Sequence, residues 1–156
     1  MLDAAAALTT VKFVVPGKPR GKQSVRVTRF GSFMPKQTEA EMEAVKYIAL
    51  AAMHGDMPMA GPVLLRMCAY VPVPKGWSRA DRLAALAGDL LPTVKPDGDN
   101  YMKLVWDACS RVVWWDDRQV TDWHGWKRYS DDPRIVVHVA ELRGGRNSNG
   151  PRIDFG

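Results

Sequence analysis

The sequence predicts an α+β fold, a single domain in which a mixed β-sheet carries helices packed against it. About five strand-like and three helix-like segments follow one another without strict β-α-β alternation, which is typical of this class. The chain has 156 residues, 46% of them hydrophobic, which is enough for one domain with a buried core. We expect the folded domain over residues 10–142, a flexible N-terminal tail over 1–9 and a basic disordered tail over 143–156.

Strand signals dominate the first part of the chain. Thr10–Val15 is rich in β-branched and aromatic residues and is ended by Pro16, which predicts a strand. The glycines and prolines of segment 16–22 predict an open loop. Val25–Met34 predicts an irregular strand or a hairpin around Gly31.

A helix is predicted to follow, from an N-cap at Thr38 to about His54. Glu41 stands three residues after Thr38, which is the spacing of a capping box, and Gly55 suits the residue that ends a helix. Val63–Val73 is a long apolar run bounded by prolines, and it predicts a central strand.

The second half of the chain adds a short helix and two strands. Segment 78–87 begins with a serine that can cap a helix, with Asp81 three residues later. Gln119–Trp126 alternates loosely between apolar and polar residues, and Ile135–Leu142 is an apolar run, so both predict strands. Between them, the acidic pair in Asp131-Asp132-Pro133 indicates a turn.

The segment Lys95–Asp117 carries the candidate chemistry. Asp97 and the glycine after it signal a turn, and Asp99 is predicted to cap a helix by accepting backbone N–H groups. Lys103 lies one turn after Asp99, and Asp107 one turn after Lys103. Residues at i, i+3, i+4 and i+7 form an apolar face of this helix: Met102, Val105, Trp106 and Cys109.

Two further carboxylates close this segment. Val112–Trp115 is a β-prone run that predicts a strand returning toward the start of the helix. If it packs there, four carboxylates converge around Lys103: Asp97, Asp99, Asp116 and Asp117. Carboxylates are the hard oxygen ligands that Mg²⁺ or Mn²⁺ prefers, and like charges so close need a cation to offset them. We interpret the segment as a metal-dependent phosphodiesterase site; the alternative is a capped helix and a solvated turn.

The chain is basic, with 22 Lys and Arg against 17 Asp and Glu and a net charge of +5. Because the acidic residues cluster in one segment, the remaining surface is more basic than the total, and DNA is the expected partner. The alternative on charge alone is a merely basic protein. Cations in loops and beside aromatic residues suit phosphate contacts. The candidates are Lys18, Arg20, Lys22, Arg26, Arg29, Lys127 and Arg128.

The remaining residue types point away from other classes of site. Cys68 and Cys109 lie in apolar segments, so we expect buried free thiols, in keeping with a cytoplasmic location. His54 suits a helix C-terminus, and His138 is expected as a hydrogen-bonded core histidine. No apolar run approaches the roughly 20 residues that a membrane span needs.

The acidic segment resembles the signature of the RusA family of Holliday junction resolvases. That pattern stands here as Asp97-Gly98-Asp99-Asn100, then Lys103, a short helix, and Asp116-Asp117 leading into a strand. Val11–Arg20 resembles the family's opening strand and basic loop, and the likeness covers Val11–Glu141. Two features depart from the family: a glycine at position 98 and a longer segment over 73–91.

The resemblance implies a RusA-like nuclease domain over residues 10–142, acting as a homodimer on branched DNA. It implies catalytic roles for Asp97, Asp99, Lys103 and Asp117, with Asp116 as the partner of the second acidic pair. The expected activity is Mg²⁺-dependent resolution of four-way junctions by paired symmetric incisions in recombination and repair. Two alternatives remain: a metal-dependent nuclease on flaps or other branched DNA, and a non-catalytic DNA-binding protein whose acidic residues are structural.

Overall fold

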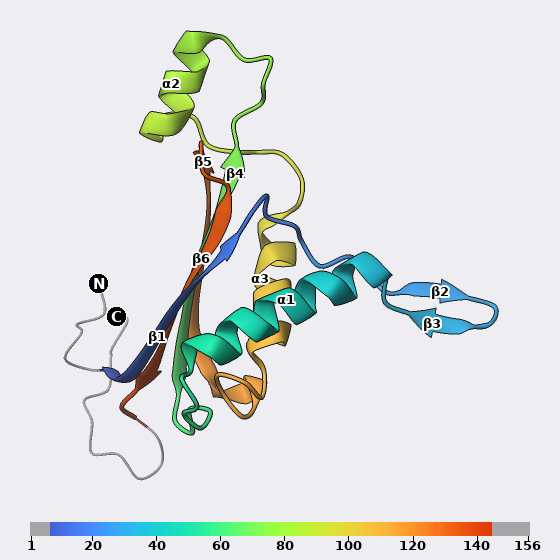
Figure 1. Ribbon diagram of the computed structural model, residues 1–156, viewed down its shortest axis with the longest axis vertical. Coiled ribbons are helices and arrows are strands. Elements are labelled where there is room, and N and C mark those ends of the chain that lie inside the picture. Colours follow the sequence, from blue (N-terminus) through green and yellow to red (C-terminus); the bar gives the residue numbers. More distant parts are fainter. Residues whose placement is uncertain (1–6, 145–156) are drawn as a thin grey trace.

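Four strands form one mixed sheet, and two helices pack against one of its faces (Figure 1). A computed structural model describes residues 7–144. The elements follow in the order β1 (Ala7–Pro16), β2 (Arg26–Thr28), β3 (Gly31–Phe33), α1 (Lys36–Ala52), β4 (Val63–Pro72), α2 (Arg79–Ala87), α3 (Gly98–Cys109), a 3₁₀ turn (Asp117–Gln119), β5 (Val120–Ser130) and β6 (Arg134–Leu142). The predicted α+β class is confirmed.

The sheet has the strand order β1-β6-β4-β5, with both parallel and antiparallel pairs. β6 runs antiparallel to β1 and to β4, whereas β5 runs parallel to β4. Parallel neighbours need a long crossover, and here the crossover contains α2, α3 and the 3₁₀ turn. The acidic segment therefore lies within the connection that joins the inner strand β4 to the edge strand β5.

The core lies between the sheet and the two helices α1 and α3, which cover the same face (Figure 1). Alternate residues of β4 point into it, and Val63, Leu65 and Ala69 are completely buried. The predicted apolar face of α3 is confirmed: its Val105 and Cys109 are fully buried, and two further members, Met102 and Trp106, pack partly buried against the core.

The predicted start of the first helix is wrong. α1 begins at Lys36, directly after Pro35, which lacks an N–H group and has the fixed φ that suits a helix start. Thr38 is completely buried within the first turn. Its hydroxyl oxygen accepts a hydrogen bond from the backbone N–H of Gln23 at 3.4 Å. The threonine therefore ties the basic loop to the helix instead of capping the helix.

Val112–Trp115 does not form the predicted strand. The residues form a turn with only isolated bridges, in which Trp114 pairs with Met59 and with Ser110. Trp114 is completely buried, so the apolar run reflects burial and not strand pairing. Arg111, at φ 63°, turns the chain sharply as α3 ends. The turn then places the acidic pair, Asp116 and Asp117, directly before the start of β5.

Two strands are longer than predicted, and the other elements agree closely with expectation. β1 already begins at Ala7, so it includes part of the predicted tail, and β5 extends to Ser130. The predicted hairpin around Gly31 is formed by β2 and β3 and projects from the domain (Figure 1). Most of the predicted C-terminal tail, and residues 1–6, lie outside the described residues.

The cysteines and histidines follow the predictions in part. Both cysteines are free thiols; Cys109 is buried, and burial raises the pKa of its thiol, whereas Cys68 is only partly buried. His138 lies on the sheet face without helices, and its Nε2 atom has no hydrogen-bond partner among the described residues, so the prediction of a hydrogen-bonded core histidine is wrong. Within residues 7–144, no helix is long and apolar enough to cross a membrane.

Candidate active site

The first acidic pair lies at the beginning of α3. Asp97, and not Asp99 as predicted, holds the N-cap position, and its side chain makes no capping hydrogen bond. Asp99 lies in the first turn, where its Oδ2 accepts a hydrogen bond from Lys103 Nζ at 2.9 Å. This hydrogen bond lowers the pKa of the Asp99 carboxyl. Both side chains are more than half exposed, so the ammonium group remains accessible to a ligand.

The second acidic pair begins the 3₁₀ turn that precedes β5. Asp116 caps this turn: its Oδ1 accepts from the backbone N–H of Arg118, and both of its oxygens accept from the Arg118 guanidinium, each at 2.9 Å. The arginine lowers the pKa of Asp116 to about 2. These bonds make Asp116 a residue that orients the turn.

Gln119 locks the same turn to the neighbouring segment. Its Oε1 accepts from the Asp116 N–H at 2.7 Å, which completes a capping box. Its Nε2 donates to the carbonyl oxygens of Met59 and Gly61 at 2.8 and 2.9 Å. One side chain thus fixes the position of the acidic pair relative to the start of β4.

Asp117 is positioned by a buried tryptophan. The indole N–H of Trp114 donates to Asp117 Oδ1 at 2.9 Å, and Trp114 is completely buried. A buried indole N–H needs a hydrogen-bond acceptor. One oxygen of the Asp117 carboxylate is that acceptor, while the rest of the group faces outward. The second oxygen, Oδ2, makes no hydrogen bond to any described residue.

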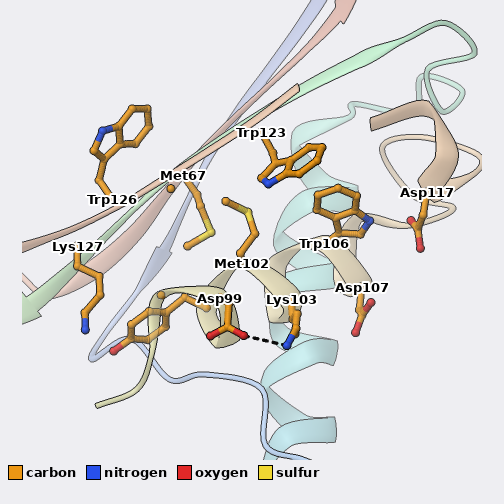
Figure 2. A pocket seen from close by; sticks show the side chains of 13 residues that line it. Met67, Asp99, Met102, Lys103, Trp106, Asp107, Asp117, Trp123, Trp126 and Lys127 are labelled. Atoms are coloured by element: carbon orange, nitrogen blue, oxygen red, sulfur yellow. Dashed lines mark hydrogen bonds and ion pairs between the residues drawn. The ribbon is translucent and has the colours of Figure 1, made fainter. Parts of the chain in front are cut away.

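Asp99, Lys103 and Asp117 line one cavity of about 690 Å³ beneath β5 (Figure 2). Figure 2 shows Asp99 and Lys103 on α3 and Asp117 on the separate turn. Asp107, one helical turn after Lys103, also lines the cavity. Sulfur and aromatic side chains form its apolar wall, among them Met67, Met102, Trp106, Trp123 and Trp126. The start of α3 and the end of the crossover therefore line the same cavity, although the strand that was predicted to bring them together does not form.

The four predicted metal ligands do not all converge. Asp97 lines a neighbouring cavity of about 620 Å³, together with the basic loop around Lys18. Asp116 is turned toward Arg118. Among residues 7–144, no three His, Cys, Asp or Glu side chains are close enough to hold a metal ion together.

The types of donor are nevertheless those that Mg²⁺ prefers. This ion is usually held by one or two carboxylates, with waters and substrate phosphate oxygens completing its octahedron. Asp99 and Asp117 supply two carboxylates to one cavity, and Asp117 Oδ2 is free of other bonds to described residues. The oxygen-only donors suit Mg²⁺ or Mn²⁺ better than zinc, which favours nitrogen and sulfur.

The predicted DNA-contacting residues separate into two groups. Arg20 pairs with Glu41 at 3.3 Å, Lys22 forms an ion pair with Asp107, and Lys127 Nζ donates to two backbone carbonyls in the segment before α3. These cations therefore hold the site together. Four others have no acidic partner among the described residues: Lys18 in the loop, Arg26 and Arg29 on the hairpin, and Arg128 on β5.

Several residues of the site were not assigned to it from the sequence. Asp107 had a signal, because it follows Lys103 by four positions and so shares its side of the helix. Gln119 had one too, since it stands three residues after an acidic cap. Trp123 had none, because its place in the cavity depends on contacts between distant segments. Trp114 donates to an acceptor only three residues away, but the composition of its segment suggested a strand.

One comparison with known proteins identifies a family, and another finds a relative without a named function. A family model described as "Endodeoxyribonuclease RusA" matches residues 16–140. A protein of Bacillus subtilis (strain 168), named "Uncharacterized protein YqaN", is 34% identical to this chain over 137 residues. That alignment covers 85% of this chain and 96% of the Bacillus protein. The family match runs from the end of β1 into β6 and includes both acidic pairs.

Proposed function

The chain belongs to the RusA family of endodeoxyribonucleases, and from this premise we propose that it is a Mg²⁺-dependent enzyme that resolves Holliday junctions by paired symmetric incisions. The observation that carries the proposal is the cavity beneath β5. Two carboxylates from different elements, Asp99 and Asp117, line it together with Lys103. Opposite charges arranged in this way suit a scissile phosphate and the cation that accompanies it.

The proposed metal ligands are Asp99 and Asp117, which line one cavity; Asp97 lines the neighbouring cavity, and Asp116 orients the turn. When bound, Mg²⁺ supplies a Lewis acid for the phosphoryl oxygens and lowers the pKa of a coordinated water. Lys103 offsets the mutual repulsion of the carboxylates and lies where it can contact a phosphate oxygen. Trp114 fixes one oxygen of Asp117, so the carboxylate needs little reorganisation when substrate arrives.

The two neighbouring cavities suggest a path for one DNA strand. Asp97 begins α3 between the basic loop and the site, and the cavity that it lines also contains Lys18. We place flanking phosphates along this loop and the scissile phosphate in the cavity of Asp99 and Asp117. Arg26 and Arg29, exposed on the projecting hairpin, supply further phosphate contacts to the branched substrate.

Two like-polarity strands must be cut to resolve a four-way junction into two intact duplexes. A two-fold symmetric dimer presents two equal sites with the symmetry that the substrate can adopt, so we propose a homodimer. The two free thiols fit a reducing compartment, and we place the enzyme in the cytoplasm with the DNA on which it acts.

The direct test is incubation of the protein with a synthetic four-way junction, a flap substrate and linear duplex, each with and without Mg²⁺. We expect cleavage of the junction alone, only with Mg²⁺, and none by Asp117→Asn. Preferential flap cleavage would identify a nuclease for other branched DNA. Metal-independent binding with no cleavage of any substrate would show a DNA-binding protein whose acidic residues are structural.

A further inference from the structure

The strand β5 forms an edge of the sheet, and its middle is exposed on both faces. β4 pairs with one side of it, and no described strand pairs with the other. The four consecutive residues Trp123 to Trp126 are all exposed, and the two tryptophans expose 56% and 41% of their surface. Long edge strands with exposed apolar side chains are normally covered, because their free N–H and C=O groups invite pairing.

The sequence of β5 favours a second copy of the same strand as the partner that covers this edge. In an antiparallel pair, residues directly opposite each other point to the same face of the sheet. Because side chains alternate along a strand, opposite residues in two copies of β5 must both be even-numbered or both odd-numbered. A two-fold axis between the copies therefore passes through one residue of the strand and never between two.

Charge complementarity then indicates the residue through which the two-fold axis passes. β5 contains one acidic residue, Asp122, and two lysine or arginine cations, Lys127 and Arg128. Lys127 cannot lie opposite Asp122, because one number is odd and the other even. Arg128 can, and only when the axis passes through Gly125. Of all the allowed registers, this one alone places the acidic residue opposite a cation.

The same register matches the other side chains. Trp123 lies opposite Lys127 of the second copy, so its ring can pack on the aliphatic stem of the lysine, and His124 lies opposite Trp126, which permits ring stacking. His124 and Trp126 already stack within one copy, with ring centroids 6.0 Å apart and planes 15° from parallel. Neither Asp122 nor Arg128 has an ion-pair partner in the part of the chain that the structure describes.

We propose that two copies of the chain pair along β5, antiparallel about Gly125, joining their sheets into one continuous sheet. This names the interface of the homodimer in the proposed function and rests on that function only for the expectation of a dimer. The axis is perpendicular to the sheet, so both copies present their helices on the same face. Since Trp123, Gly125, Trp126 and Lys127 line the candidate active site, the two sites lie on either side of the axis and open toward one substrate.

The test uses charge reversal at the two residues of the proposed ion pair, with the mass of the particle measured by light scattering. The wild-type chain of 17.4 kDa should form a particle of about twice that mass. By symmetry, Asp122→Arg and Arg128→Asp each replace two attractive contacts with two repulsive ones. Each should raise the dimer dissociation constant at least about tenfold.

Recombining the reversed charges distinguishes an interface from a folding defect. The double variant Asp122→Arg/Arg128→Asp should dimerise again, and so should an equimolar mixture of the two single variants. Lys46→Glu, an exposed charge reversal on α1, should leave the mass unchanged. Because the readout is mass, these outcomes do not depend on nuclease activity.

Three results would overturn the inference, whatever the DNA-cleavage assay shows. They are single variants that remain as dimeric as wild type, a mixture of variants that stays monomeric, and a wild-type chain that is monomeric at assay concentration. The first result would move the dimer interface elsewhere and leave the proposed nuclease function intact.

Discussion

Replacing Gln119 with alanine should both destabilise the protein and impair the candidate site. The side chain makes three hydrogen bonds: one accepted from the Asp116 N–H and two donated to the carbonyls of Met59 and Gly61. A net contribution of about 1 kcal/mol for each bond gives a loss of about 3 kcal/mol. Because these groups are only partly buried, water replaces part of this, and we expect about 2 kcal/mol of the free energy of unfolding.

Urea unfolding measures this loss directly. With a slope of about 2 kcal/mol per molar urea, the midpoint should fall by about 1 M. Gln37→Ala is the matched control, because that exposed glutamine on α1 has no side-chain hydrogen bond in the described residues, and its midpoint should hardly change. At a temperature where Gln119→Ala is still folded, cleavage should fall while DNA binding persists, since the turn that carries Asp117 is no longer fixed to the start of β4. A change in the free energy of unfolding below about 0.5 kcal/mol would refute the claim that the Gln119 hydrogen bonds fix the turn.

Three further predictions concern the charged residues. Asp97→Asn, Asp99→Asn and Asp117→Asn should each abolish cleavage while leaving junction binding intact or tighter, because each removes a carboxylate of the candidate site and some repulsion toward phosphate. A gel assay separates the two properties. Lys103→Ala should remove most activity and raise the pKa of the Asp99 carboxyl, since the lysine lowers it. The carboxyl should therefore titrate at higher pH by NMR, and the acid limb of the pH–rate profile should shift to higher pH. Lys18→Ala should lower the slope of log binding constant against log salt by about 0.9, as one lost phosphate contact.

Each of these predictions has a control and a contrary outcome. Asp131→Asn changes an acidic residue that pairs with Arg82 away from the site and should cleave normally. Wild-type rates in all three acidic variants would disprove the site assignment. An Asp99 titration unchanged by Lys103→Ala would contradict the ion pair, and an unchanged salt slope would remove Lys18 from the DNA interface.

The parts of the fold that follow local rules could be predicted from the sequence. The apolar run Val63–Pro72 with its flanking prolines is the inner strand β4, and Ser78 caps α2 by accepting from the Asp81 N–H at 3.1 Å. The contact between Asp99 and Lys103 follows from helical spacing alone. Such features depend on neighbours within a few residues, which is why the sequence is sufficient.

The features that were mispredicted depend on burial and on packing that the local pattern does not specify. Val112–Trp115 carries a strand-like composition, but Trp114 is buried by a turn and donates to Asp117. Thr38 has the spacing of a cap, but its hydroxyl is used by the basic loop. Asp97 and Asp99 are two residues apart, yet the first turn of α3 directs them to different cavities. The burial of Trp114, the hydrogen bond of Thr38 and the directions of the two aspartates could not be predicted from a local sequence pattern.

The measurement that tests the central claim most directly is the fate of a supercoiled plasmid bearing an extruded cruciform, incubated with the protein and Mg²⁺. A dimer that cuts both strands within one binding event converts the plasmid mainly to linear product, with little nicked circle at any time. Asp117→Asn should leave the plasmid supercoiled. Accumulation of nicked circles by a protein that light scattering shows to be monomeric would contradict the resolvase account and favour a nuclease that cuts one strand at a time.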